Sequence, residues 1–126
     1  MRGATVLCVD DAEGILKLYE NLFGVHGYEV VSATNGFQAL AAHARSPRID
    51  AAILDYDMPG MTGFELAIQL KHRDPTLPIM MVSGVEPDWE KMKPFVDASL
   101  TKGVPIRDII KKIKVLMSKR EPISKQ

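Results

Sequence analysis

The chain has 126 residues, with 16 Lys+Arg against 16 Asp+Glu, so its formal net charge is zero. Its length suits a single domain, and 46% hydrophobic with 25% charged residues exclude a disordered chain. The longest uninterrupted apolar runs have four residues, far fewer than the roughly 20 that a membrane helix needs. Because there is one cysteine and no secretory leader pattern, we expect a soluble protein in the reducing cytoplasm, away from membranes.

The zero net charge hides an uneven distribution. Residues 1–63 carry 4 basic and 8 acidic side chains, whereas residues 64–126 carry 12 basic and 8 acidic ones. A basic segment can contact nucleic acid, but no recognition motif accompanies this one. Its lysines alternate with an isoleucine stripe, which is typical of a solvated helix face. We therefore expect no direct binding to nucleic acid.

Short apolar segments alternate with helical patterns along the whole chain. The expected strands are 5–10, 28–33, 51–54, 78–83 and 98–101, and the expected helices are 12–27, 35–45, 64–72, a short one within 88–93, and one starting near Pro105. Helical spacing of apolar residues predicts four inward faces: Ile15, Leu18, Tyr19 and Leu22; Phe37, Leu40, Ala41 and Ala44; Phe64, Ala67 and Ile68; and Ile106, Ile109, Ile110, Ile113, Leu116 and Met117.

Five strand–helix repeats predict an α/β fold with a parallel sheet covered on both faces. The domain is expected to span 1–118, followed by a flexible tail, 119–126. In such folds ligands bind at the carboxyl ends of the strands. The expected strand ends carry polar side chains, and these converge in one crevice if the first, third, fourth and fifth strands are neighbours: Asp10 and Asp11, Asp55, Ser83, and Lys102.

These residue types fit phosphoryl transfer to an aspartate. Clustered carboxylates repel one another unless a cation compensates, and an all-oxygen site suits Mg²⁺. A carboxylate such as Asp55 can attack phosphorus to give an aspartyl phosphate. Lys102 and the Ser83 hydroxyl would face the charge of the phosphoryl oxygens. Asp57 is either a second catalytic carboxylate or, as we favour, a loop residue lending its carbonyl oxygen.

At these residues the chain resembles the receiver domain of two-component response regulators, over about residues 4–117. The acidic pair Asp10-Asp11 follows VLCV, and the ILDYDMPGMTG block surrounds Asp55 with a DxxMPxMxG pattern. Ser83-Gly84 follows IMMV, and LTK ends at Lys102. The order of the acidic pair and the block makes chance assembly very improbable.

The resemblance implies a flavodoxin-like (βα)5 doubly wound fold with strand order 2-1-3-4-5. It implies that Asp55 is the phosphoacceptor and that Asp11, Asp55 and the carbonyl of Asp57 ligate Mg²⁺, with Asp10 acting through water. Lys102 would pair with the phosphoryl group and Ser83 would hydrogen-bond it. The donor would be a phosphohistidine on a histidine kinase or histidine phosphotransfer protein, and the output a downstream effector or a missing output domain.

Two positions in the expected switch region depart from the family pattern. Ser99 stands where the family usually carries an aromatic switch residue, three positions before the lysine. Gly103 stands where a proline in a cis peptide usually follows the lysine, so we expect a trans bond here, because a non-proline cis bond costs roughly 2.5–4 kcal/mol. The short interval between Ser83 and Lys102 also predicts an abbreviated fourth helix.

Three functions follow, in order of preference. The first is a signalling domain that catalyses only its own phosphorylation and dephosphorylation. The second, raised by Ser99, is a phosphorylation-independent interaction module. The third is a phosphatase, because Asp55-Tyr56-Asp57 resembles the DxD of haloacid-dehalogenase-like enzymes, although those place further acidic ligands late in the chain. A monomer or a weak dimer is compatible with all three.

Overall fold

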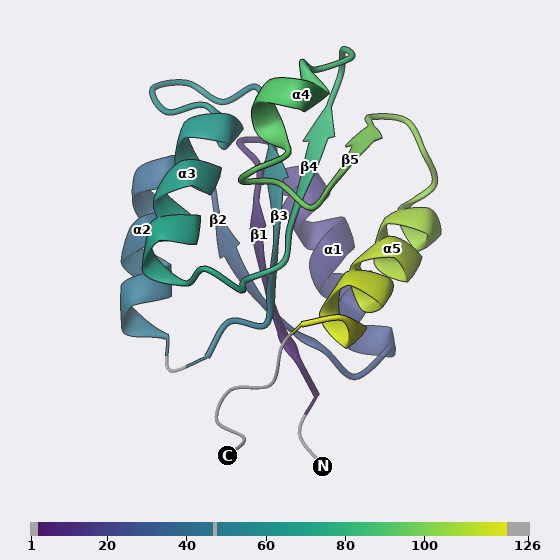
Figure 1. Ribbon diagram of the computed structural model, residues 1–126. Helices are drawn as coiled ribbons and strands as arrows, with labels where there is room; N and C mark the ends of the chain where they lie inside the picture. The colour runs from purple at the N-terminus through teal and green to yellow at the C-terminus, as the bar shows by residue number, and fades with distance from the viewer. Residues whose placement is uncertain (1–2, 47, 121–126) are drawn as a thin grey trace.

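Five strands and five helices alternate in a computed structural model that describes residues 3–46 and 48–120 (Figure 1). The strands are β1 (Thr5–Val9), β2 (Glu29–Ala33), β3 (Ala51–Asp55), β4 (Ile79–Ser83) and β5 (Ala98–Thr101). The helices are α1 (Glu13–Val25), α2 (Gly36–Arg45), α3 (Gly63–Arg73), α4 (Trp89–Met92) and α5 (Ile106–Ser118). All strand pairs are parallel in the order β2-β1-β3-β4-β5, which confirms the predicted flavodoxin-like fold.

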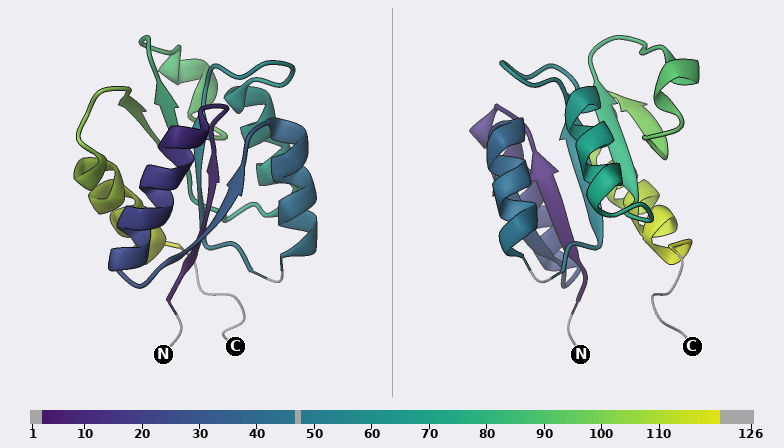
Figure 2. Two further views of the ribbon diagram at one scale, coloured as in Figure 1. Left: turned by 180° about the vertical axis from the view of Figure 1, so that it is seen from behind. Right: turned by 60° about the vertical axis from the view of Figure 1, so that its left-hand side comes forward.

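Helices cover both faces of the sheet. Figures 1 and 2 show α2 and α3 on one face and α1 and α5 on the other. The central strands alternate between two apolar clusters: Leu7 and Leu54 pack toward α2 and α3, whereas Cys8, Ile53 and Met80 pack toward α1 and α5. The central strands β1, β3 and β4 are buried along their whole length, as expected for continuous apolar runs in a parallel sheet.

Side-chain caps fix where α2 and α3 begin. Asn35 caps α2 as predicted, because its side chain accepts a hydrogen bond from the amide of Gln38 at 2.8 Å. Thr62 and Glu65 form a reciprocal capping box at the start of α3. The start of α3 is therefore fixed eight positions after the end of β3.

The predicted inward face of α1 is partly wrong. Leu16, Tyr19 and Phe23 are buried, whereas Leu18 and Leu22 are 44% and 37% exposed. The sequence of α1 offers two overlapping apolar arcs, and the arc that carries the large ring of Phe23 is the one that packs on the sheet. The choice depends on the shape of the opposing surface, which helical periodicity does not specify.

The faces of α2 and α3 also differ from the prediction. In α2 the buried side chains are Ala39 and Ala42, while Phe37 is 65% exposed. In α3 they are Leu66, Ala67 and Leu70, so only Ala67 of the predicted set is fully buried. Because Ala39 and Ala42 are small, α2 can approach the sheet closely. Their low hydrophobicity, compared with that of Phe37 and Leu40, does not mark them in the sequence as the buried face. The predicted stripe of α5 is confirmed, with Ile109, Ile110 and Ile113 at its buried centre.

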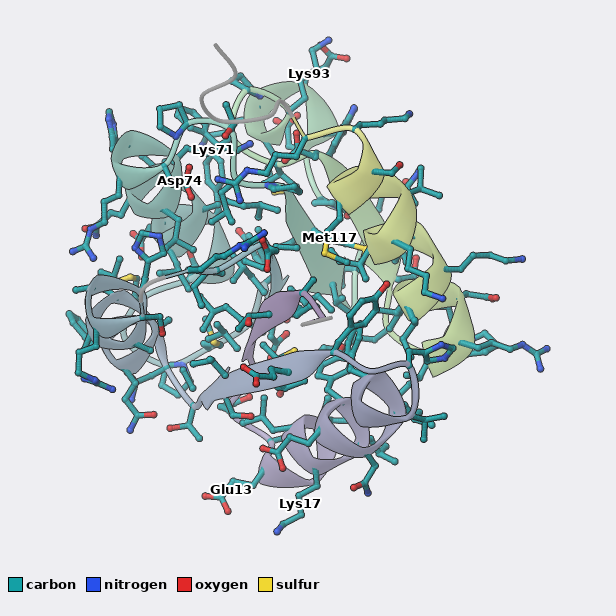
Figure 3. All side chains as sticks on the ribbon, turned by 90° about the horizontal axis from the view of Figure 1, so that it is seen from below. Glu13, Lys17, Lys71, Asp74, Lys93 and Met117 are labelled. Atoms are coloured by element: carbon teal, nitrogen blue, oxygen red, sulfur yellow. The ribbon has the colours of Figure 1, made fainter. Side chains whose placement is uncertain are left out.

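Arg120 makes its contacts where the strands of the sheet begin, at the end opposite their carboxyl ends. Its guanidinium donates to both carboxylate oxygens of Asp74 at 2.8 Å, and also to the Ile49 carbonyl and the Thr76 hydroxyl. Figure 3, which looks onto this end of the sheet, labels Asp74 at the end of α3. The ordered contacts thus extend two residues into the predicted tail 119–126, whose remainder lies outside the described residues.

No helix within the described ranges has both the length and the apolar character that crossing a membrane requires.

Candidate functional site

Three aspartates meet at the carboxyl edge of the sheet. Asp10 and Asp11 directly follow β1, and Asp55 is the last residue of its neighbour β3. The parallel register pairs Val9 with Leu54, so the two strands end at the same level. One carboxylate oxygen from each aspartate lies within 4.8 Å of the others. The predicted convergence of these three side chains is therefore present.

Asp55 lies at the centre of the cluster and is only 1% exposed. Its Oδ1 lies 3.0 Å from the Nζ of Lys102 and accepts a hydrogen bond from the Asp57 amide at 3.3 Å. Its Oδ2 is buried and has no hydrogen-bond partner among the described residues. A buried carboxylate oxygen is costly without a partner, and a cation held by the three carboxylates supplies one. The donor set thus fits Mg²⁺, which prefers oxygen ligands.

Lys102 reaches this carboxylate from the far side of β4. It follows β5, and its backbone amide donates to the Ser83 carbonyl at 2.8 Å, which fixes the backbone from which its side chain extends. Gly103 follows with a positive φ of 102°, a conformation that favours glycine. The peptide bond between them is trans, since the described residues contain no cis bond, and this confirms the expectation for Gly103.

Burial dominates the electrostatics of the cluster. Desolvation raises the pKa of Asp55 above its usual range, and the Lys102 ammonium offsets only part of this effect. Desolvation also raises the pKa of Asp10, and the nearby charges of Asp55 and Asp11 add to it. The hydrogen bond to Asp55 raises the pKa of Lys102. When all three carboxylates are ionised, they carry more negative charge than the Lys102 ammonium alone neutralises.

The other predicted site residues lie nearby but do not bond to the carboxylate cluster through their side chains. The Ser83 hydroxyl donates to the Val85 carbonyl at 2.8 Å and accepts from the Val85 amide at 3.3 Å. Asp57 is exposed and gives Asp55 only its amide, in keeping with a loop residue. Ser99 pairs with Met81 in the sheet and lines a cavity beside β5.

Gly63 also shapes the site, although it was not among the predicted site residues, because it has no side chain that could take part in the chemistry. A Cβ at this position would lie 2.4 Å from the Asp55 carbonyl oxygen and 2.8 Å from the Met81 sulfur. The first turn of α3 therefore packs directly on the end of β3, which is possible only without a side chain. The signal in the sequence is the glycine that closes the DxxMPxMxG pattern.

Sequence comparisons agree with this geometry. Residues 6–114 match the family model described as response regulator receiver domain. The alkaline phosphatase synthesis transcriptional regulatory protein PhoP of Bacillus subtilis is 28% identical over 92% of this chain and 49% of its own length. Sporulation initiation phosphotransferase F of the same organism is 34% identical over 67% of each chain. The chain thus spans about half the length of the first of these relatives.

Solved structures show the same fold. A CheY-like receiver domain protein from Methanospirillum hungatei has a TM-score of 0.86 and 28% identity, and covers 93% of this chain and 95% of its own. TrrA from Thermotoga maritima, solved with Mg²⁺-BeF, has a TM-score of 0.79 and 26% identity over 90% of this chain and 98% of its own. With the acidic cluster, the lysine and the family match over most of its length, the chain belongs to the response regulator receiver domain family.

Proposed function

We propose that this domain accepts a phosphoryl group on Asp55 and thereby changes its interactions with a partner or output domain. The observation that carries the proposal is the state of the Asp55 carboxylate: one oxygen is held by Lys102, and the other is buried without a partner beside Asp10 and Asp11. A carboxylate that is desolvated, oriented and adjacent to a cation is suited to attack phosphorus.

The reaction is a transfer between two nucleophiles. A carboxylate oxygen of Asp55 forms the new bond to phosphorus while the bond from phosphorus to a donor histidine nitrogen breaks. The electron pair of the broken bond stays on the imidazole, and the product is an acyl phosphate. Lys102 is placed to pair with the added oxygens, because its ammonium already lies 3.0 Å from Oδ1 of Asp55.

Mg²⁺ would be held by the carboxylates of Asp11 and Asp55 and by the Asp57 carbonyl, with Asp10 beside them acting through a bound water. When bound, the ion supplies positive charge that lowers the repulsion between the carboxylates and an incoming phosphoryl group. Asp10 is buried and its Oδ1 accepts from the Ala12 amide, so one of its oxygens is already occupied. This arrangement suits the less direct role proposed for Asp10.

The donor is proposed to be a phosphohistidine on a histidine kinase or histidine phosphotransfer protein. Relatives named as transcriptional regulatory proteins are about twice as long as the matched segment, so an output domain or a separate effector would receive the signal. The proposed location is the cytoplasm, where the single thiol of Cys8, buried in β1, would stay reduced.

Incubation with Mg²⁺ and acetyl phosphate tests the proposal. We expect one phosphoryl group per chain by intact mass, removed by hydroxylamine as an acyl phosphate is. Asp55→Asn should abolish the addition, whereas Asp57→Asn, which keeps the backbone contact to Asp55, should retain it. Stoichiometric labelling of the Asp55→Asn protein would falsify the site assignment, and multiple turnovers of a phosphomonoester would favour the phosphatase alternative.

A phosphorylation-independent interaction module is a second candidate, because Ser99 offers no ring to move and the Ser83 hydroxyl is bonded to Val85. The two functions differ in how a partner responds to beryllofluoride with Mg²⁺. Partner affinity that changes with beryllofluoride supports the switch, and identical affinity in both states supports the module. Gly103→Pro would test the switch less directly, because Gly103 has a positive φ that proline cannot adopt, so the variant would also change the backbone of the loop.

A further inference from the structure

We propose that the first turn of α2 positions the phosphorylation loop, residues 56–62, through Met61 and Phe37, and so sets how well the Asp57 carbonyl binds Mg²⁺. This inference rests on the proposed function of Asp55. The loop runs from the end of β3 to the start of α3, and Figures 1 and 2 show it above the start of α2. Two contacts join the loop to α2, and each of them uses a glycine.

The first contact is that of Met61 with Gly36, the first residue of α2. A Cβ added to Gly36 would lie 2.5 Å from the Met61 sulfur, 3.0 Å from its Cβ and 3.1 Å from its Cγ. Gly36 is buried, and Met61 is only 7% exposed. The Met61 side chain therefore lies directly on the backbone of α2, in space that a side chain at Gly36 would fill.

In the second contact the glycine belongs to the loop and the large side chain to the helix. Gly60 has a positive φ of 87°, and a Cβ added there would meet Cε2 of the Phe37 ring at 3.6 Å. Phe37 is 65% exposed, so burial in the core does not account for a phenylalanine at this position. Its ring instead covers one side of the turn at Gly60.

Hydrogen bonds fix the two ends of the loop but not its middle. At the start, the Tyr56 amide donates to a carbonyl of β4 at 2.9 Å, and at the end Thr62 belongs to the capping box of α3. Within the described ranges, the only backbone–backbone hydrogen bond of residues 58–61 runs from the Met61 amide to the Pro59 carbonyl, inside the loop. The middle of the loop therefore depends on side-chain packing for its position, and both contacts with α2 lie there.

The first turn of α2 is itself held by hydrogen bonds. The Asn35 side chain accepts from the Gln38 amide at 2.8 Å, and the Gln38 side-chain oxygen accepts from the amide and the hydroxyl of Thr34 at 2.9 and 2.8 Å. Thr34 directly follows β2, so these bonds connect the turn to the sheet. Because the helix start is bonded in this way and the middle of the loop is not, a changed contact should displace the loop and not the helix.

The loop carries two groups of the phosphorylation site. The Asp57 carbonyl is the proposed Mg²⁺ ligand, and the Asp57 amide donates to Oδ1 of Asp55 at 3.3 Å. Gly60 and Met61 follow in the same short loop, so a shift of their turn shifts Asp57 as well. Phe37 and Met61 are therefore positioning residues, whose effect reaches Asp57 through the loop.

Phe37→Ala tests the second contact with little loss of buried surface, because Phe37 is mostly exposed. We expect this variant to bind Mg²⁺ about tenfold more weakly in titration calorimetry, at the lower end of the effect of groups that support a metal ligand. Phe37→Tyr keeps the ring and should bind as the wild type does. Leu18→Ala, which shortens an exposed apolar side chain of α1 on the opposite face of the sheet, is the control and should leave the affinity unchanged.

Gly36→Ala tests the first contact by adding atoms. The new methyl group would collide with the Cβ of Met61, which cannot move without the loop backbone. Gly24→Ala, also in a helix, meets no atom within 4 Å and is the control. Amide hydrogen exchange of the metal-free proteins is the second readout. Peptides that cover residues 56–62 should exchange faster in Gly36→Ala and Phe37→Ala than in the wild type and the controls.

The phosphorylation rate with acetyl phosphate separates an effect on the metal from an effect on the chemistry. Gly36→Ala and Phe37→Ala should need more Mg²⁺ for half of the maximal rate, and their rates at saturating Mg²⁺ should approach that of the wild type. A lower maximal rate with an unchanged Mg²⁺ requirement would contradict the proposed role of the loop.

Three further results would overturn the inference: unchanged Mg²⁺ affinity in both variants, weaker affinity with loop exchange as in the wild type, or equal weakening by Leu18→Ala. Failure of the proposed function has a different signature. A wild-type protein that binds Mg²⁺ but accepts no phosphoryl group would contradict the role of Asp55, while Mg²⁺ affinity and loop exchange would still decide the role of Phe37 and Met61.

Discussion

Lys102 and Asp55 form an ion pair of 3.0 Å although their strands are not neighbours. Asp55 ends β3 and Lys102 follows β5, with β4 between them. The lysine side chain therefore extends across the end of β4 to reach the carboxylate. The Lys102 side chain is 43% exposed while that of Asp55 is fully buried, so the cation enters the pocket from the solvent side, where a phosphoryl group also has to enter.

Lys102→Ala should slow phosphorylation of Asp55 on the order of 100-fold, as loss of one group that stabilises developing negative charge does. Mg²⁺ binding should change little, because the three carboxylates remain. The conformational response to beryllofluoride should be lost. Phosphorylation rates and Mg²⁺ titration calorimetry measure the two effects separately. Lys93→Ala, which removes a surface pair with Glu90, is the control, and an equal effect in both variants would contradict the role of Lys102.

Asp10→Asn should stabilise the protein at neutral pH in the absence of divalent cations. Burial raises the pKa of Asp10 above 3.8 in the folded state, so its contribution to stability is fully present below that pH and is lost as the pH rises through the folded pKa. The asparagine variant avoids this loss. We expect its Tm to exceed that of the wild type at pH 7, with the difference disappearing near pH 3. A difference independent of pH would contradict this origin.

Gly63→Ala should destabilise the domain by about 1–3 kcal/mol, as overpacking in a well-filled interior does. The added methyl group would collide with the Asp55 carbonyl oxygen and the Met81 sulfur. Gly24→Ala is the matched control, because Gly24 lies in α1 and its new methyl group meets no atom within 4 Å. It should stabilise by up to about 1 kcal/mol through helix propensity. Urea denaturation of both variants distinguishes these opposite signs.

Arg120→Ala should cost about 1–3 kcal/mol of unfolding free energy, because it removes charge-assisted hydrogen bonds in a partly buried position. Arg48→Ala should cost less than about 1 kcal/mol, since the Arg48 side chain that pairs with Asp50 is 64% exposed. Thermal denaturation at low and high salt compares the two pairs. Equal losses would mean that the two contacts of Arg120 with Ile49 and Thr76 contribute nothing.

The order of elements and the acidic cluster were predictable because both depend on local chemistry. A strand that ends in Asp55 carries that side chain to the sheet edge whatever the helices do, and parallel strands bring Asp10 and Asp11 to the same edge. The inward faces of α1 and α2 were not predictable from periodicity. Phe37 illustrates why: its hydrophobicity favours burial, but the face of α2 that is buried against the sheet carries Ala39 and Ala42, and Phe37 is 65% exposed.

The direction of the Ser83 hydroxyl was also beyond sequence reasoning. Position alone places Ser83 at the end of β4, beside Asp55. Its hydroxyl has two local backbone partners in Val85, and a choice between these and a distant phosphoryl oxygen depends on whether that oxygen is present. The position of Ser83 in the sequence therefore predicted where its hydroxyl lies but not which atoms it bonds to.

The anchoring of Arg120 places a second set of charged contacts at the end of the sheet opposite Asp55. The residues that hold it, Asp74, Thr76 and Ile49, precede β4 and β3, whereas Asp55 ends β3. The Asp55 carboxylate and the contacts of Arg120 are thus separated by the length of a five-residue strand, roughly 15 Å at about 3.3 Å per residue. The two ion pairs, Lys102–Asp55 and Arg120–Asp74, therefore lie at opposite ends of a sheet whose central strand β3 is buried along its whole length.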